Sequence, residues 1–170
     1  MKHLTVYKLF ENNNEDFSNF ISDKKLDIDF RYEEIEVSEL VGEIITHIII
    51  NEDKTEMIFV VESQGGYEFY KFYHEQDCCE SVELYDVNGD LNDMIDEVVI
   101  KAEEVRQEAK DDELQYDESG TWTFYKFATS KGYITLRWLG ESNGYYSEVM
   151  SFVKSNTIIE SHEELEKLLA

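Results

Sequence analysis

The feature of this sequence that most constrains its fold is a stretch without acidic residues. Residues 119–140 contain no Asp or Glu, although the chain of 170 residues carries 39 acidic side chains. Within the stretch, apolar and aromatic residues alternate with small or polar ones, which is typical of β-strands with one buried face. Turn residues separate the strands that we expect at 121–128, 132–139 and 145–153. The sequence therefore predicts a three-stranded antiparallel meander in the C-terminal third.

The middle of the chain predicts further strands. Residues 44–62 are expected to form a β-hairpin, because β-branched and apolar residues flank a turn-like segment at 51–54. Strands are also expected at 67–74 and 81–87, the latter ending at the Asn88-Gly89 step. Residues 98–108 fit a strand or a helix, because 98–100 favour a strand and AEEVRQEAK favours a helix. Of the two, we expect a strand that passes into a charged loop.

Helices are expected to be short and peripheral. Asp90 is the predicted N-cap of a helix at 91–95, and Ser161 with Glu164 forms a capping box for the closing helix. A further helix is expected at 11–25, after a weak strand at 1–9. The predicted fold class is therefore α+β, with a mostly antiparallel β-sheet (hairpin plus three-stranded meander) and short peripheral helices.

The alternation of apolar residues within the expected strands also predicts the core. These side chains share one face of their strands and are aromatic or branched. They are Phe59, Tyr70, Phe72, Phe124, Ile134, Leu136 and Trp138.

The charge of the chain excludes several classes of partner. Its 39 acidic residues against 15 Lys and Arg give a formal net charge of −24, and such a surface repels nucleic-acid phosphates. Residues 75–118 alone hold 17 acids and 3 bases. The chain is 42% hydrophobic, enough for one folded domain. It has no apolar run near the ~20 residues that span a bilayer. We expect a cytoplasmic protein with no direct contact to nucleic acid or membrane.

Cysteine spacing and loop composition predict no cofactor and no metal. Cys78 and Cys79 are adjacent, whereas structural zinc sites space their cysteines by two to four residues. We expect both thiols to be reduced, one as core filler and one half-exposed. Residues 86–97 align with a calcium-binding loop, but Leu91 stands where that loop requires glycine. A turn followed by an N-capped helix accounts for the same residues.

The segment most typical of a binding site is GESNGYYSE, at residues 140–148. Its glycines, carboxylates, hydroxyls and tyrosines are consistent with a binding rim. A hairpin loop followed by an edge strand accounts for them equally well, so both interpretations stay open. The sequence contains no HExxH and no glycine-rich phosphate loop. We therefore expect no enzymatic activity.

Two blocks of the sequence resemble the signature blocks of a domain family of unknown function found in phage and bacterial genomes. The first block, residues 74–105, contains QDCCESV, and the second, residues 121–152, contains GESNGYYSE. With the strands before them, the resemblance covers residues 41–153. It leaves 1–40 as an N-terminal extension and 154–170 as a C-terminal helix. The resemblance implies a phage or prophage context and no catalytic residues.

Charge and resemblance together predict a protein that works by binding. We expect it to bind and inhibit a host protein with a basic surface, such as a nucleic-acid-handling or anti-phage defence factor, by partial charge mimicry of nucleic acid. The alternative is a small-molecule or metal-binding module near Cys78 and Glu141. The expected partner-binding residues are mostly carboxylates from the acidic stretch and the rim: Asp86, Asp90, Asp93, Asp96, Glu97, Glu141 and Tyr145. We expect Lys101 and Arg106 to be too few to neutralise the first five.

Overall fold

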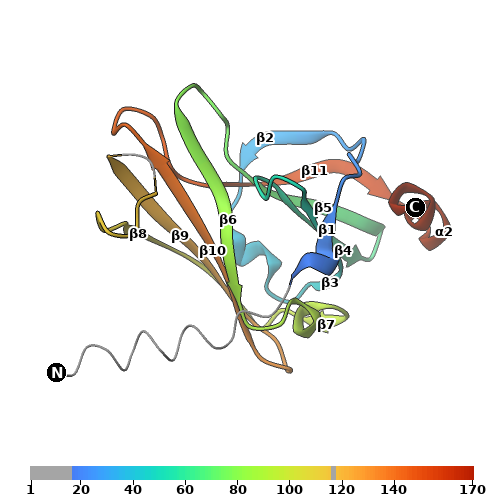
Figure 1. The fold of residues 1–170 in the computed structure, drawn as a ribbon. Helices are drawn as coiled ribbons and strands as arrows, with labels where there is room; N and C mark the ends of the chain where they lie inside the picture. The colour runs from blue at the N-terminus through green and yellow to red at the C-terminus, as the bar shows by residue number, and fades with distance from the viewer. Residues whose placement is uncertain (1–16, 116–117) are drawn as a thin grey trace.

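A computed structural model describes residues 17–115 and 118–170, which fold into two β-sheets packed face to face (Figure 1). Sheet A has the order β1-β3-β4-β5-β11-β2, with β7 joined to β3, and sheet B has the order β6-β10-β9-β8. The strands of sheet A are β1 (Ile21–Ser22), β2 (Phe30–Glu34), β3 (Ile44–Asn51), β4 (Met57–Ser63), β5 (Gly66–Tyr73), β7 (Glu97–Val98) and β11 (Ser151–Ile159). The strands of sheet B are β6 (Glu80–Asn88), β8 (Lys101–Glu108), β9 (Ser119–Ala128) and β10 (Tyr133–Ser142).

The predicted antiparallel sheet is confirmed, but the predicted α+β class overstates the helical content. Strand pairings are antiparallel except for the short β1, which runs parallel to β3. In the described residues the only α-helix is α2 (His162–Leu169). The other helical segments are 3₁₀ turns, η1 (Ser18–Phe20), η2 (Val37–Leu40) and η3 (Leu91–Met94). The fold is therefore mostly β, because the main core lies between the two sheets.

The core between the sheets is aromatic. Phe72 lies at its centre, with ring centroids 4.9 Å from Phe59 and 4.7 Å from Tyr125. Six of the seven predicted core residues are buried. Phe124 is the exception, since it lies half-buried on the outer face of sheet B and stacks on Trp122. The prediction was one residue out of register on β9, and a shift of one residue moves every side chain to the opposite face.

The predicted hairpin at 44–62 is confirmed as β3 and β4, and its turn is held by one side chain. The Asn51 Oδ1 atom accepts hydrogen bonds from the backbone N–H groups of Thr55 at 2.8 Å and Glu56 at 2.9 Å. The strand predictions for 67–74, 81–87 and 98–108 are confirmed as β5, β6 and β8 with small shifts of their ends.

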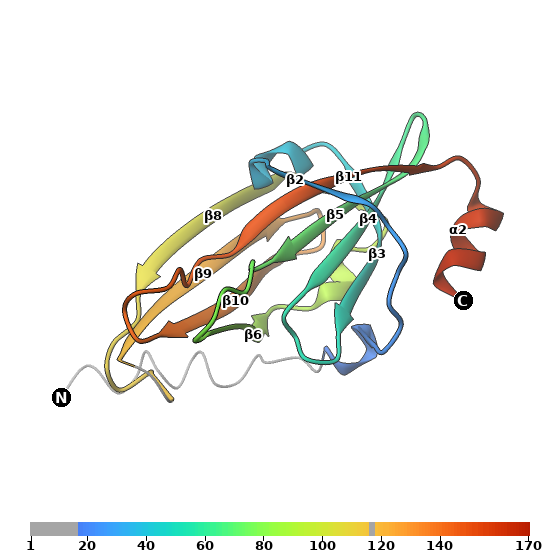
Figure 2. The same cartoon turned by 90° about the horizontal axis from the view of Figure 1, so that it is seen from above.

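The predicted C-terminal meander is only partly correct. β9 and β10 pair as expected, but the third strand of the meander is β8, which precedes them in the sequence. β11 leaves sheet B and inserts between β5 and β2 in sheet A (Figure 2). Residues 143–150 must therefore cross from one sheet to the other.

The closing helix α2 is confirmed and packs on the outer face of sheet A. The Ser161 side chain accepts a hydrogen bond from the backbone N–H of Glu164 at 3.3 Å, as the capping box predicts. Leu165 is fully buried against Val60 and Phe69. The helix therefore covers apolar side chains that the two-sheet core leaves outside.

The N-terminal predictions have mixed outcomes. The expected strand at 1–9 and the first part of the expected helix at 11–25 lie outside the described residues. Residues 17–25 are not α-helical, because they form η1 and β1 and then continue without regular structure.

No helix in the described part of the chain is both long and apolar enough to span a membrane.

Candidate functional site

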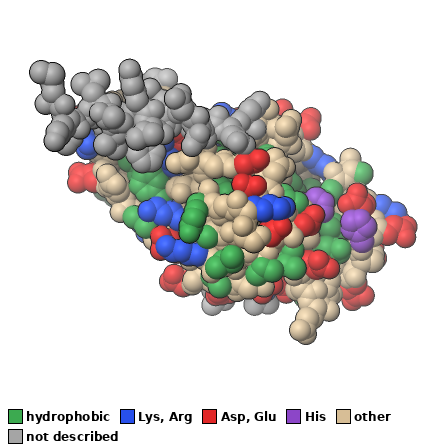
Figure 3. Space-filling view, turned by 90° about the horizontal axis from the view of Figure 1, so that it is seen from below, with side chains coloured by type: hydrophobic (Ala, Val, Ile, Leu, Met, Phe, Trp, Pro, Cys, Tyr) green, Lys and Arg blue, Asp and Glu red, His purple; other side chains and the backbone are tan. Residues whose placement is uncertain are grey.

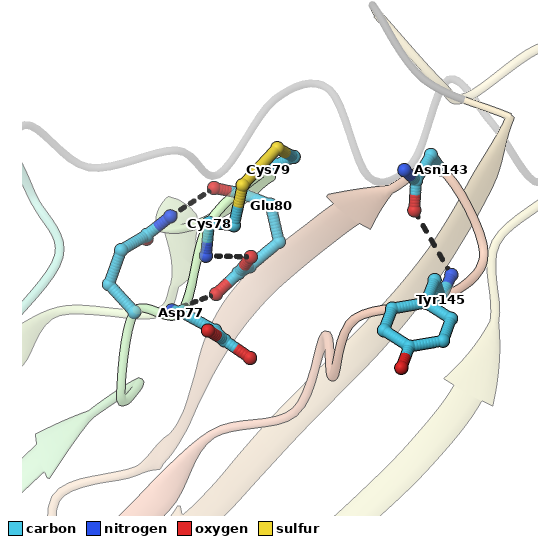
Figure 4. The surroundings of a disulfide bond; sticks show 7 residues. Asp77, Cys78, Cys79, Glu80, Asn143 and Tyr145 are labelled. Atoms are coloured by element: carbon cyan, nitrogen blue, oxygen red, sulfur yellow. Dashed lines mark hydrogen bonds between the residues drawn. A yellow bond between two sulfur atoms is a disulfide. The ribbon is translucent and has the colours of Figure 1, made fainter.

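Two loops that are far apart in the sequence meet at one end of the sandwich. Residues 74–79 connect β5 to β6, and residues 143–150 connect β10 to β11. The pairing of β6 with β10 places Ser142 opposite Glu80 and Glu141 opposite Ser81. We call this region the paired-loop end (Figure 4). It brings together the QDCCE and GESNGYYSE runs, the two most distinctive runs of the sequence.

Glu80 is a buried carboxylate at the start of β6, and loop 74–79 folds around it. Its Oε1 atom accepts a hydrogen bond from the backbone N–H of Asp77 at 2.5 Å, and its Oε2 atom accepts one from that of Cys78 at 3.1 Å. The Asp77 bond is the main cause that lowers the pKa of Glu80 from 4.5 to about 2, against the opposing effect of burial. The Cys78 bond and His74 lower the pKa further. Glu80 therefore organises the loop as an anion.

His74 ties Glu80 to the segment that leads into β11. Its Nδ1 atom lies 2.8 Å from the carbonyl oxygen of Val149, and its Nε2 atom lies 3.2 Å from Glu80 Oε1. A carbonyl oxygen and a carboxylate only accept hydrogen bonds, so each ring nitrogen of His74 faces an acceptor oxygen. The side chain is 7% exposed. The two loops are thus joined through a largely buried polar contact.

Cys78 and Cys79 form a disulfide between neighbouring residues. The expectation that both thiols are reduced, one of them in the core, is therefore wrong for this structure, since both residues are exposed at the tip of loop 74–79. Adjacent side chains point to opposite faces only within a strand. Cys78 and Cys79 lie in a turn before β6 begins, where that alternation does not apply.

The second loop is held by another buried carboxylate, Glu148. Its Oε1 atom accepts a hydrogen bond from the Ser142 hydroxyl at 2.5 Å, and its Oε2 atom accepts one from the Thr121 hydroxyl at 2.8 Å. The loop also packs directly on Gly140, where an added Cβ would lie 2.1 Å from the Glu148 carbonyl oxygen. Gly140 therefore permits the close approach of the loop to β10.

Tyr145 lies at the tip of the second loop and is 84% exposed. The turn before it is fixed by Asn143, whose Oδ1 atom accepts a hydrogen bond from the Tyr145 backbone N–H at 3.1 Å, and by Gly144 at φ +87°. Tyr146 packs edge-to-face on Tyr145 with ring centroids 5.1 Å apart. An aromatic side chain is thus presented to solvent on an ordered loop.

An acidic cleft of about 420 Å³ opens at the same end. Its rim carries the exposed side chains of Glu34, Glu75 and Asp77. His74 and Glu80 also line it, and Ser147 and Ser151 supply hydroxyls. The arrangement fits a cationic or hydrogen-bond-donating group.

The acidic residues predicted as the first binding surface lie around η3, at the opposite end of β6. Asp86 is buried, and its Oδ2 atom lies 2.9 Å from Nη1 of Arg137. Glu97 accepts a hydrogen bond from the Ser130 hydroxyl at 2.6 Å and pairs with Lys131 at 3.1 Å. The Ser130 bond, followed by the Lys131 contact, lowers the pKa of Glu97.

These ion pairs correct the sequence reasoning about neutralisation. We expected Lys101 and Arg106 to be the available cations, but Arg137 and Lys131 neutralise Asp86 and Glu97. Both cations come from the acid-free stretch, which the fold places directly beside the acidic one. Asp86 and Glu97 hold the first and last positions of the calcium-loop alignment. Both therefore form ion pairs within the protein.

The remaining predicted site residues differ in exposure. Asp90 caps η3 by accepting a hydrogen bond from the Asn92 backbone N–H at 2.8 Å, as predicted. Asp93 is half-buried and Asp96 is exposed. Glu141 is 5% exposed, and its Oε1 atom accepts a hydrogen bond from the Gln115 backbone N–H at 2.7 Å. The structure thus removes Asp86 and Glu141 from any exposed surface, whereas Asp96 and Tyr145 are exposed.

Sequence reasoning missed Glu80, His74 and Glu148 as organising residues. Their partners are distant in sequence, since His74 bonds Val149, and Glu148 bonds Thr121. The only local signal was a glutamate directly after a turn, where backbone N–H groups are free to bond a carboxylate.

The described part of the chain contains no preformed metal site, because no group of three or more His, Cys, Asp or Glu side chains is arranged there to hold an ion.

Comparison with known proteins matches residues 38–152 to the family DUF7448, described as a domain of unknown function. No match was found among curated proteins or among solved structures.

Proposed function

We propose that this chain, which belongs to the DUF7448 family, works without catalysis by binding a protein partner with a basic surface at the paired-loop end. The observations that carry the proposal are the acidic cleft and the exposed Tyr145, which both lie at this end of the sandwich (Figure 4). Protein interfaces combine an aromatic anchor with charged residues at their rim. Lysine or arginine side chains of the partner enter the cleft, and Tyr145 packs against the surface next to them.

The total charge supports a basic partner. Even if each of the 15 Lys and Arg side chains neutralises one acid, the formal charge of −24 remains. On the face that is lowest in Figure 1, carboxylates are interspersed with lysine and arginine side chains (Figure 3). At the paired-loop end, the acids gather around a concave site. A field of one sign focused by a cleft accelerates the encounter with an oppositely charged partner.

The finer form of the proposal concerns the identity of the partner. The protein is a phage or prophage product that inhibits a host nucleic-acid-handling or anti-phage defence factor, with its carboxylates taking the place of phosphates. The net charge supports this form, since a surface that neutralises phosphates also attracts carboxylates. So does the β-framework, because hydrogen-bonded strands hold charges at fixed spacings.

The alternative of a small-molecule or metal-binding module receives less support. Cys78 and Glu141 do lie at the same end of the molecule, because β6 pairs with β10. Glu141 is occupied by the Gln115 backbone N–H, however, and the cysteines are joined to each other. The cysteines are therefore not available as ligands in this arrangement, and Glu141 is largely buried with one oxygen already hydrogen-bonded.

Affinity purification with the full chain, followed by binding kinetics with each captured protein, tests the proposal. The variant Glu75→Gln/Asp77→Asn removes two charges at the cleft, and Tyr145→Ala removes the aromatic anchor. The matched control is Asp111→Asn/Asp112→Asn, which removes two exposed charges outside the cleft. We expect both site variants to weaken binding at least tenfold, roughly the loss of one interface hot spot, and the control to stay within about twofold. Equal binding by all four proteins would contradict the proposal.

A further inference from the structure

We propose that Cys78 and Cys79 are a reversible thiol–disulfide couple whose oxidised form holds loop 74–79 in the conformation that binds Glu80. The coupling between the cysteines and Glu80 stands on the geometry of the loop alone. Only its consequence for partner binding rests on the proposed function. The paired-loop end would then exist in two forms, selected by the thiol redox state of its surroundings.

The position of the disulfide supports reversibility. Both cysteines are exposed at the tip of the loop, so a small thiol can reach either sulfur. Their Cα atoms are 3.8 Å apart, as for any neighbours across one peptide bond. The disulfide therefore closes no long loop, and its stabilising effect is confined to the turn.

The same turn supplies the hydrogen bonds to Glu80. One donor is the backbone N–H of Cys78 itself, and the other is that of Asp77, the residue before it. The disulfide closes a ring that restricts the backbone of Cys78 and Cys79. It therefore fixes the direction in which the chain leaves the loop and enters β6. With the disulfide opened, the turn gains conformational freedom, and aligning both N–H groups on one carboxylate costs more entropy.

Reduction is balanced with glutathione as the reductant. A glutathione thiolate attacks one sulfur of the pair, the Cys78–Cys79 bond breaks, and a mixed disulfide and one cysteine thiolate form. A second glutathione thiolate attacks the mixed disulfide, which releases oxidised glutathione and the second cysteine thiolate. Both cysteine thiolates then take protons from solvent. Two electrons pass from two glutathione molecules to the pair, and the reverse sequence restores the disulfide.

Thermodynamic reciprocity makes the coupling measurable. If the disulfide favours the hydrogen bonds to Glu80, then those hydrogen bonds favour the disulfide by the same factor. Removing the carboxylate must therefore make the pair easier to reduce. A disulfide that is independent of Glu80 would show no such change.

The change also reaches the cleft. Glu80 and His74 both line it, and His74 bonds Glu80 on one side and the Val149 carbonyl on the other. Loosening Glu80 removes one of the two partners that fix the His74 ring. We therefore expect the His74 environment to differ between the oxidised and reduced protein.

Equilibration of the full chain in glutathione buffers of varied redox ratio, followed by alkylation and mass measurement, tests the proposal. The proteins compared are the wild type, Glu80→Gln and the matched control Glu83→Gln, an exposed glutamate on the same strand. We expect the wild type to interconvert fully between dithiol and disulfide. Glu80→Gln should shift the equilibrium constant about tenfold towards the dithiol, and Glu83→Gln should match the wild type. A wild type that stays dithiol at every ratio, or identical curves for all three proteins, would overturn the proposal.

A second measurement needs no variant at Glu80. In the wild type, the imidazole NMR signals of His74 should move between the oxidised and reduced forms, whereas those of the exposed His162 should not. An unchanged His74 signal would overturn the coupling. Partner binding by the two redox forms is a separate comparison, and its outcome decides only the function assigned to the cleft.

Discussion

The two ends of β6 both carry carboxylates, but the fold uses them differently. At the paired-loop end, Glu80 is buried and accepts hydrogen bonds from two backbone N–H groups and His74. At the other end, around η3, Glu97 pairs with a lysine and Asp96 faces solvent. The comparison shows that a count of acids along the sequence does not measure the charge that a partner meets. Some carboxylates hold a loop in place through hydrogen bonds. Others face solvent and produce the negative electrostatic field.

The two ends differ in how much hydration their carboxylates lose on folding. A buried anion loses its hydration, so it persists only where hydrogen-bond donors take the place of water. Loop 74–79 provides such donors because its backbone is not paired in a sheet. Near η3, Asp90, Asp93 and Asp96 remain in contact with water and need fewer partners. The buried Asp86 is the exception, and it pairs with Arg137. Changes at the paired-loop end should therefore alter folding, and changes near η3 should mainly alter electrostatics.

The largest expected effect is that of Gly140→Ala. The added Cβ would lie 2.1 Å from the Glu148 carbonyl oxygen, so the second loop must move away from β10. We expect a loss of about 3 kcal/mol in the free energy of unfolding, measured by urea denaturation. Gly65→Ala is the control, since no atom lies within 4 Å of its added Cβ. If both variants are equally stable, the loop is not held against β10.

Acid sensitivity should depend on Glu80. Its pKa is about 2 in the folded protein and 4.5 ordinarily, so the ionised form stabilises the fold fully above pH 4.5. That contribution is lost as the pH falls towards and through 2. We expect Glu80→Gln to lower the Tm by several degrees at neutral pH. The difference from the wild type should shrink as the pH falls below 4.5. A constant difference in Tm from pH 7 to pH 2 would show that ionisation of Glu80 is not the cause.

The contrast between the two ends also explains what the sequence could predict. The Asp90 and Ser161 caps and the hairpin at 44–62 depend on neighbours within a few residues, so local patterns identify them. The burial of Asp86 cannot be predicted locally, because its partner, Arg137, is 51 residues away and becomes a neighbour only when β6 pairs with β10.

Strand placement failed for a similar reason. Nothing in the residues of β11 shows that it joins sheet A and not sheet B. Phe124 was assigned to the core because both faces of β9 carry aromatic residues. Alternation alone does not say which face is inward when both are apolar. Exposure of Tyr145 likewise depends on how loop 143–150 crosses between the sheets, and the hydrogen-bond partner of Glu141, Gln115, is 26 residues away in the sequence.

Association rates of charge variants should show which end of β6 is the binding surface. Glu75→Gln/Asp77→Asn and Asp93→Asn/Asp96→Asn each remove two negative charges, the first at the cleft and the second beside η3. We expect the cleft variant to slow association with the captured partner about tenfold at low salt, and the η3 variant to slow it less. Both differences should shrink near physiological ionic strength, where the Debye length is about 8 Å. A larger effect of the η3 variant would move the binding surface to that end.

The smallest expected effect concerns Asp90, and it tests whether a carboxylate near η3 is needed for its charge or only for its oxygen. Asp90 accepts a hydrogen bond from the Asn92 backbone N–H at 2.8 Å, and an asparagine side chain can accept the same bond. We therefore expect Asp90→Asn to keep the stability of the wild type and Asp90→Ala to lose about 0.5 kcal/mol, measured by urea denaturation with Glu83→Ala as the control. At Glu80 an amide cannot replace the carboxylate, because both oxygens accept hydrogen bonds and an amide presents an NH₂ group to one of the donors. Loss of stability in Asp90→Asn equal to that in Asp90→Ala would mean that the negative charge itself supports η3, and the distinction between the two ends of β6 would then be one of degree.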